Sequence, residues 1–154
     1  MFTLVHVIIS VLGIITGLVA VGGLMAGTRR EGVTATFLVT TVLTNATGFG
    51  FASERLLPSH VVAVLSLVLL AVCVVARYVK ELRGGWRRIF VITAVAALYF
   101  NVFVLVVQLF AKTPQLAALA PTQSEPPFAL TQLLVLGVFV WLGRASLRGF
   151  SAAR

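Results

Sequence analysis

Long apolar runs separated by short polar segments make up almost the whole of this 154-residue chain. Each run approaches the roughly 20 residues that an α-helix needs to cross the hydrocarbon core of a bilayer. The pattern predicts five membrane-spanning helices, at residues 2–25, 33–51, 58–79, 89–111 and 128–147. We therefore expect an all-α, polytopic integral membrane protein, with one membrane domain of five helices over residues 1–154.

Small and polar residues recur at helical spacing in the first two predicted helices, which places them on one face of each helix. In the first helix this face holds His6, Ser10, Gly13, Gly17 and Ala20. In the second helix it holds Thr36, Thr40, Thr44 and Thr47, with Asn45 beside them. Gly13 and Gly17 form a GxxxG pair, which lets helix backbones approach closely in membranes. The face of the first helix should therefore contact protein rather than lipid, and Asn45 on the second helix needs a hydrogen-bond partner.

The charged residues determine the expected orientation. Only 10% of the residues are charged and the mean hydropathy is +1.09, which together exclude an ordinary soluble domain. The chain has 12 Lys and Arg against 4 Asp and Glu, a formal net charge of +8. With five spans, ten basic residues fall on one side, and only Arg55 and Lys112 fall on the other. Basic residues favour the cytoplasmic side. We expect an external N-terminus and a cytoplasmic C-terminus, in a bacterial-type cytoplasmic membrane.

The basic cytoplasmic loop at residues 77–88 should meet anionic lipid head groups. This contact with the bilayer accounts for the positive charge, so we expect no nucleic-acid partner.

Each predicted helix places one strongly polar side chain in the outer half of the membrane. These residues are His6, Asn45, His60, Gln108 and Gln132. The inner half holds little comparable beyond Thr36, Ser66 and Thr93. A polar group in hydrocarbon must be paired or hydrated, so five at similar depth predict a shared pocket. Asn101 would form its floor, and residues 54–60 would form its rim.

Amides and hydroxyls in this pocket would bind a small neutral or anionic molecule. The candidate ligand-binding residues are Asn45, Thr47, Asn101, Gln108 and Gln132. The Pro-rich outer loop at residues 112–127 is long enough to serve as a lid. The same amides are also typical of plain hydrogen bonds between membrane helices.

The two histidines raise the alternative of a bound cofactor. Neutral imidazoles of His6 and His60, from two helices, would ligate the iron of a b-type haem or hold a transition metal. Gly13 and Gly17 would then let a flat macrocycle approach the backbone.

Catalytic motifs are missing from the sequence. No HExxH, GxSxG, GxxxxGK[ST] or CxxC pattern occurs, and the four glutamates fall in predicted loops. The single cysteine, Cys73, rules out a disulfide within one chain. We expect a non-enzymatic membrane protein that binds a small ligand or cofactor, in a transport or redox role. The alternative is a non-catalytic accessory or assembly subunit of a larger membrane complex, and a homo-oligomer is also compatible with the sequence.

Overall fold

The computed structural model describes residues 1–50 and 58–152, and every regular element within them is helical. The elements are α1 (Phe2–Met25), α2 (Glu31–Gly48), α3 (Pro58–Val74), the π-helical turn η1 (Val75–Val79), α4 (Trp86–Lys112), α5 (Pro114–Leu119) and α6 (Pro126–Ala152). The all-α prediction is confirmed. Helix α1 and the α3–η1 pair have the predicted bounds, whereas α4 and α6 extend beyond the predicted spans at both ends. The predicted rim residues Glu54 to Leu57 lie outside the described residues.

Four helices of the described chain are long and apolar enough to cross a membrane. They are α1, the segment His60–Val79 of α3 and η1, α4, and Pro126–Ser151 of α6. Helix α2 is not among them, because Glu31, Asn45 and six threonines lower its hydropathy. The helices are therefore those of a multi-pass membrane protein, and the fifth crossing stays a prediction.

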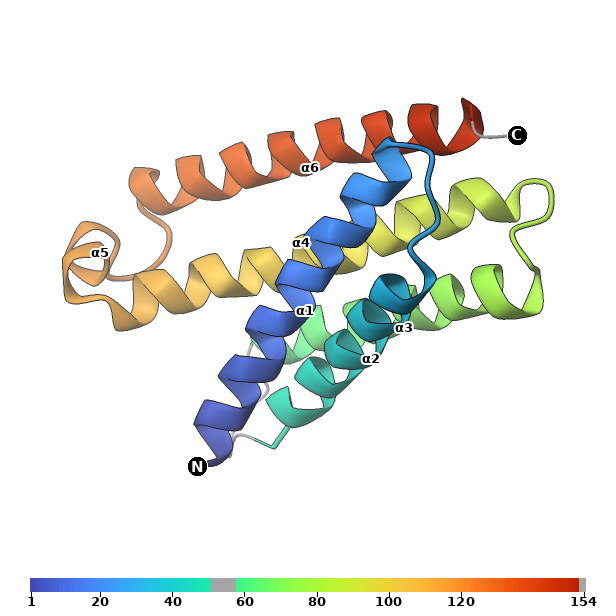
Figure 1. Ribbon diagram of the computed structural model, residues 1–154. Helices are drawn as coiled ribbons and strands as arrows, with labels where there is room; N and C mark the ends of the chain where they lie inside the picture. Colours follow the sequence, from blue (N-terminus) through green and yellow to red (C-terminus); the bar gives the residue numbers. More distant parts are fainter. Residues whose placement is uncertain (51–57, 153–154) are drawn as a thin grey trace.

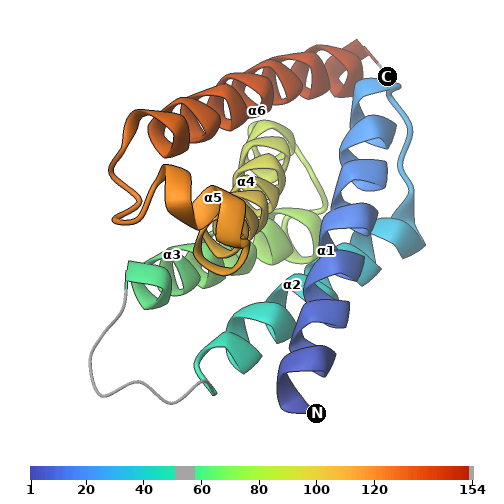
Figure 2. The same cartoon turned by 90° about the vertical axis from the view of Figure 1, so that its left-hand side faces the viewer.

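Successive long helices run in opposite directions, which collects the connections at two ends of the bundle (Figure 1). The N-terminus and α5 lie at one end, called here the N-terminal end. The α1–α2 turn (residues 26–30), the turn at residues 80–85 and the end of α6 lie at the other, called here the basic end. Helix α4 contacts α1, α3 and α6, and Figure 2 shows it surrounded by these three.

The core lies along α4 and is made of apolar side chains from five helices. Its largest fully buried members are Phe37 of α2, Leu70 of α3, Phe90 and Leu98 of α4, and Phe150 of α6. Gly17 of α1 lies directly against two of them, because a Cβ there would stand 2.5 Å from Leu98 Cδ1 and 2.9 Å from the Phe37 ring. The predicted small face of α1 therefore does contact protein.

The tight turn between α1 and α2 depends on Gly27. Its φ of +70° is the left-handed conformation that favours glycine. The N–H groups of Gly27 and Thr28 donate to the carbonyls of Leu24 and Gly23, at 3.1 and 2.8 Å. These two bonds form a Schellman motif, which ends α1. The chain then reverses direction, and α2 packs against α1.

The Pro-rich loop predicted at residues 112–127 contains the short helix α5. Pro114 occupies the first turn of this helix, where a missing N–H has no cost. Leu116 and the buried Ala120 pack against Val106 and Phe110 of α4. The amide Nε2 of Gln123 also donates to the carbonyl of Val107, at 3.0 Å. The loop thus folds back onto the end of α4.

Candidate functional site

A buried network of polar side chains joins α2, α3 and α4. Asn45 Nδ2 donates to the carbonyl of Thr41 at 2.9 Å and to Ser66 Oγ at 3.1 Å. Asn101 Nδ2 donates to Thr41 Oγ1 at 3.1 Å. All four residues are buried. We call Thr41, Asn45, Ser66 and Asn101 the amide network, and it ties three helices together at one level.

Two of the four members were predicted as site residues and two were missed. Asn45 and Asn101 belong to the predicted pocket, whereas Ser66 was expected in the inner half and Thr41 was given no role. The contact with Asn45 brings Ser66 to the level of the network. Ser66 is the only hydroxyl residue within residues 61–76, and Thr41 precedes Asn45 by one helical turn. Both features can be read from the sequence, but only the structure shows which residues Ser66 and Thr41 bond to.

His6 and Thr47 form a second polar pair, between α1 and α2. His6 Nδ1 lies 2.7 Å from Thr47 Oγ1. The Thr47 hydroxyl donates to the carbonyl of Leu43 at 2.7 Å, so its oxygen accepts from His6 Nδ1–H. Ser10 Oγ donates to the carbonyl of His6 at 2.7 Å. The pair orients the His6 ring toward the last turn of α2.

His60 of α3 is held by the residue that ends α2. Its ring stacks on Phe49, with centroids 5.5 Å apart and planes 8° from parallel. Both histidines therefore contact the same end of α2, through Thr47 and Phe49. No group of three or more His, Cys, Asp or Glu able to hold a metal ion occurs among the described residues. A two-histidine haem or metal site stays a prediction.

The two predicted glutamines lie in different environments. Gln132 of α6 is buried, and its Nε2 donates to the carbonyl of Phe103 on α4 at 3.2 Å. Gln132 Oε1 is buried with no hydrogen-bond partner in the described chain. Gln108 is exposed. The predicted residues thus fall into separate groups: the amide network, the His6–Thr47 pair, and Gln132 between α4 and α6.

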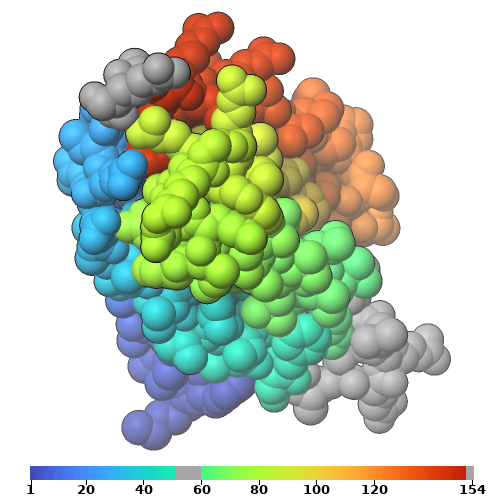
Figure 3. Space-filling model, turned by 90° about the vertical axis from the view of Figure 1, so that its right-hand side faces the viewer, coloured from blue at the N-terminus to red at the C-terminus, as the bar shows by residue number. Residues whose placement is uncertain are grey.

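The basic end forms a continuous surface from three parts of the chain. Figure 3 views this end, with the α1–α2 turn in blue, residues near 80–88 in yellow-green and the end of α6 in red. The core residue Phe150 lies beneath Arg29 and Arg87, whose guanidinium carbons stand 5.7 and 4.5 Å from its ring centroid. Gly149 contacts the end of α1, because a Cβ there would stand 1.9 Å from the Met25 carbonyl oxygen.

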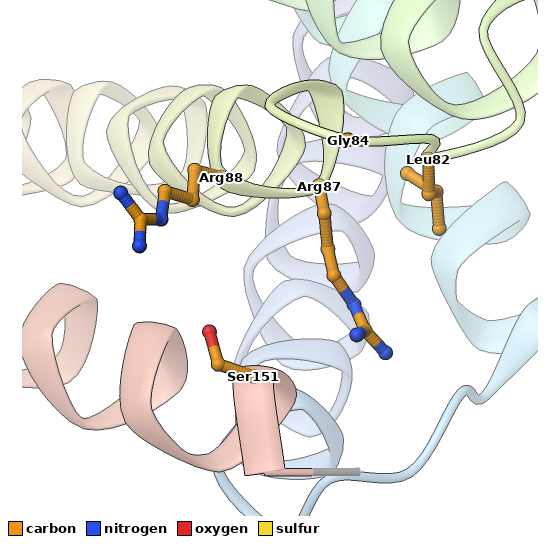
Figure 4. A pocket seen from close by; sticks show the side chains of 5 residues that line it. All are labelled: Leu82, Gly84, Arg87, Arg88 and Ser151. Atoms are coloured by element: carbon orange, nitrogen blue, oxygen red, sulfur yellow. The ribbon is translucent and has the colours of Figure 1, made fainter. Parts of the chain in front are cut away.

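Two hollows open on this surface. The smaller, of about 310 Å³, is lined by Arg87 and Arg88 from the start of α4, by Ser151 from the end of α6, and by Leu82 and Gly84 (Figure 4). The larger, of about 500 Å³, lies beside Arg29 and Arg77. Sequence reasoning gave this end a general role in contact with lipid but no site, since nothing in the local pattern shows that these segments enclose space.

The chain thus has buried amides between its helices and basic residues gathered at one end. No protein-family model, no curated protein and no solved structure matches this chain.

Proposed function

We propose that this chain is a non-catalytic subunit of a membrane assembly that contains more than one chain. The observation that favours a subunit role over a ligand-binding role is the use of the buried amides as contacts between helices. Asn45, Asn101 and Gln132 each donate a hydrogen bond to a neighbouring helix of the same chain. An amide used in this way holds helices in register, and contacts of this kind contribute about 0.6 kcal/mol each in membrane proteins.

The peripheral helices leave room for other subunits. Within the membrane-length window, 44% of α4 is buried inside the chain, but only 22% of α1 and 11% of α6. The exposed large apolar residues of α6 are Leu130, Leu133, Leu134, Leu136, Val138, Val140 and Trp141. Gly137, which has no atoms within 4 Å of a Cβ placed on it, lies among them. This face supports contact with lipid, with a second copy of the chain, or with a different membrane helix.

The arrangement of the ends supports five crossings of a bacterial-type cytoplasmic membrane, with the N-terminus outside. Helix α2 has 18 residues, a length of about 27 Å at about 1.5 Å per residue, close to the hydrocarbon thickness of about 30 Å. It packs between α1 and α3, and Thr40, Thr41 and Asn45 are covered by protein. The basic end then lies in the cytoplasm, beside anionic head groups.

Native mass spectrometry of the full chain, extracted from its own membrane in a mild detergent, tests the proposal. We expect masses above that of one 16.4 kDa chain. A simple multiple would identify a homo-oligomer, and additional chains would identify a mixed complex. A single chain at every detergent concentration, including those that preserve known membrane complexes, would overturn the proposal.

A second candidate function is binding of a small ligand or cofactor near the N-terminal end. Thr44 Oγ1 and Gln132 Oε1 favour it, because both are buried with no hydrogen-bond partner in the described chain. Such atoms are costly unless a ligand or water satisfies them. The same mass spectra would show a bound molecule as a constant mass increment. An absorption spectrum before and after dithionite would reveal a haem, and a His6→Ala variant would then lose the band.

A further inference from the structure

Arg77, whose charge is poorly compensated, lines the larger hollow at the basic end. The hollow, of about 500 Å³, lies between the start of α2 and the turn after η1, and its lining includes Arg29, Glu31, Arg77, Tyr78 and Glu81. The Arg77 side chain is only 7% exposed, and its Nε has no hydrogen-bond partner among the described residues. Arg77 is therefore a buried guanidinium with an unused hydrogen-bond donor.

The contacts of Arg77 within the chain are weak for a buried charge. Its guanidinium lies 5.4 Å from the ring centroid of Phe90 and 5.5 Å from that of Tyr78. Its ion pair with Glu31 has an N–O distance of 3.5 Å, and the Glu31 carboxylate is 77% exposed to solvent. Burial of a charge is expensive unless it is well paired and hydrogen-bonded. A bound oxyanion would supply the missing acceptor.

The backbone around Arg77 is also unusual. Arg77 lies within the π-helical turn η1, a feature found frequently at functional sites. Glu81 and Leu82 follow with φ values of +51° and +58°, in the left-handed region that non-glycine residues rarely adopt. Strained conformations of this kind persist where the surroundings hold them in place. Residues 81 and 82 therefore line the hollow in a fixed, non-helical conformation.

The charges around the hollow indicate the chemistry of the ligand. Arg29 and Arg77 present guanidinium groups, which bind phosphate through charge-assisted hydrogen bonds. Glu31 and Glu81 lie on the same lining, and they would repel a second negative charge but attract an ammonium group. Tyr78 is 54% exposed, as expected for an aromatic residue at the lipid–water interface.

We propose that this hollow binds the headgroup of a zwitterionic aminophospholipid, such as phosphatidylethanolamine. The phosphodiester accepts hydrogen bonds from Arg77 and Arg29, and the ammonium group donates to Glu31. The proposal goes beyond the subunit role, and it requires only that the basic end lies at the level of the lipid headgroups. It is independent of whether the chain joins a larger assembly.

Native mass spectrometry of delipidated, full-length protein tests this site. The probes are phosphatidylethanolamine, phosphatidylglycerol and phosphatidylcholine with matched acyl chains, each added separately. We expect phosphatidylethanolamine to be retained most strongly, because phosphatidylglycerol lacks the ammonium group and the choline nitrogen has no N–H to donate. Equal retention of the three lipids would overturn the proposal.

Variants locate the binding. We expect Arg77→Gln and Arg29→Gln each to weaken retention of phosphatidylethanolamine about tenfold or more, by loss of a charge-assisted bond. Arg148→Gln removes the same charge from an exposed side chain at the same end that does not line the hollow, and it should bind like the wild type. If Arg77→Gln does not fold, Arg29→Gln provides the comparison. Equal retention by Arg29→Gln and Arg148→Gln would overturn the proposal.

Two further measurements separate the parts of the headgroup. Glu31→Gln should narrow the preference for phosphatidylethanolamine over phosphatidylglycerol, because the ammonium group loses its acceptor. An unchanged preference would contradict the role of Glu31. Millimolar inorganic phosphate should leave the bound lipid in place. Displacement of the lipid by inorganic phosphate would identify a site for a free anion instead and would overturn the lipid assignment.

Discussion

Asn45 on α2 donates a hydrogen bond to Ser66 on α3 across 3.1 Å, and these residues are only 8% and 1% exposed. The bond joins α2 and α3, which pack against each other. Asn45 Nδ2 also donates to the carbonyl of Thr41, whereas the buried Ser66 hydroxyl accepts from Asn45 in place of water.

A double-mutant cycle measures the strength of this bond. We expect Asn45→Ala and Ser66→Ala to be coupled by about 0.6 kcal/mol, and by no more than about 1.7 kcal/mol, the range found for hydrogen bonds between membrane helices. The measurement is the free energy of unfolding in mixed micelles for the wild type, both single variants and the double variant. Strictly additive effects would show that the two side chains do not interact.

Gly17 sets the distance between α1 and its neighbours. A Cβ at this position would stand 2.5 Å from Leu98 Cδ1, so we expect Gly17→Ala to lower the free energy of unfolding by about 1–3 kcal/mol through overpacking. Gly22→Ala is the matched control, because nothing lies within 4 Å of a Cβ there. The control should be neutral or slightly stabilising, since alanine favours the helix. Equal thermal stability of the two variants would contradict the packing.

Gly149 sets the distance between α6 and the end of α1, where its nearest neighbours are the backbone atoms of Leu24 and Met25. A Cβ there would stand 1.9 Å from the Met25 carbonyl oxygen, and backbone cannot rotate away as a side chain can. We expect Gly149→Ala to destabilise the protein by more than Gly17→Ala. Gly143→Ala, whose Cβ would meet Val95 at an ordinary 3.7 Å, should have little effect. Thermal unfolding followed by tryptophan fluorescence compares the three variants.

Glu125 immediately precedes α6 and accepts hydrogen bonds from the N–H and hydroxyl of Thr122 and from the N–H of Ser124. Slight desolvation acts to raise the pKa of Glu125, but these bonds outweigh it and hold the pKa below its ordinary 4.5. The stabilisation is therefore present above the pKa of the unfolded chain, and it is lost as the pH falls through the lowered pKa of the folded chain.

An NMR titration of the Glu125 carboxyl group in micelles checks this shift. Thr122→Val removes the hydroxyl donor while it keeps the side-chain shape, so the midpoint should move upward toward 4.5. An unchanged midpoint in this variant would contradict the role of the hydroxyl.

Cysteine labelling tests the orientation in the membrane. In a Cys73→Ala background, we expect Thr3→Cys and Ser124→Cys to react with an impermeant maleimide in intact cells. Thr28→Cys and Arg83→Cys should react only after the cells are permeabilised, because the basic end is cytoplasmic in this topology. All four substituted positions are exposed. Labelling of Thr28→Cys from outside, with Arg83→Cys still labelled only after permeabilisation, would show that α2 does not cross the membrane.

The sequence by itself determined the helices and their character. Apolar runs of membrane length predict where α1, α3, α4 and α6 lie, because helix formation in lipid depends mainly on local composition and length. The spacing of Gly13 and Gly17 predicted that one face of α1 contacts protein, and Gly17 does lie against Leu98 and Phe37. These properties are local, so they can be read along the chain.

Only the tertiary structure determined which polar residues meet. The rotation and axial position of α2, α3 and α4 bring Ser66 to Asn45 and Thr41 to Asn101, and they leave Gln108 exposed. The same packing buries Arg77 beside Phe90 while Arg83, six residues later, stays in solvent. Helical periodicity tells which residues share a face, but the partner of that face depends on contacts between segments far apart in sequence. For this reason the helices were predictable and their sites were not.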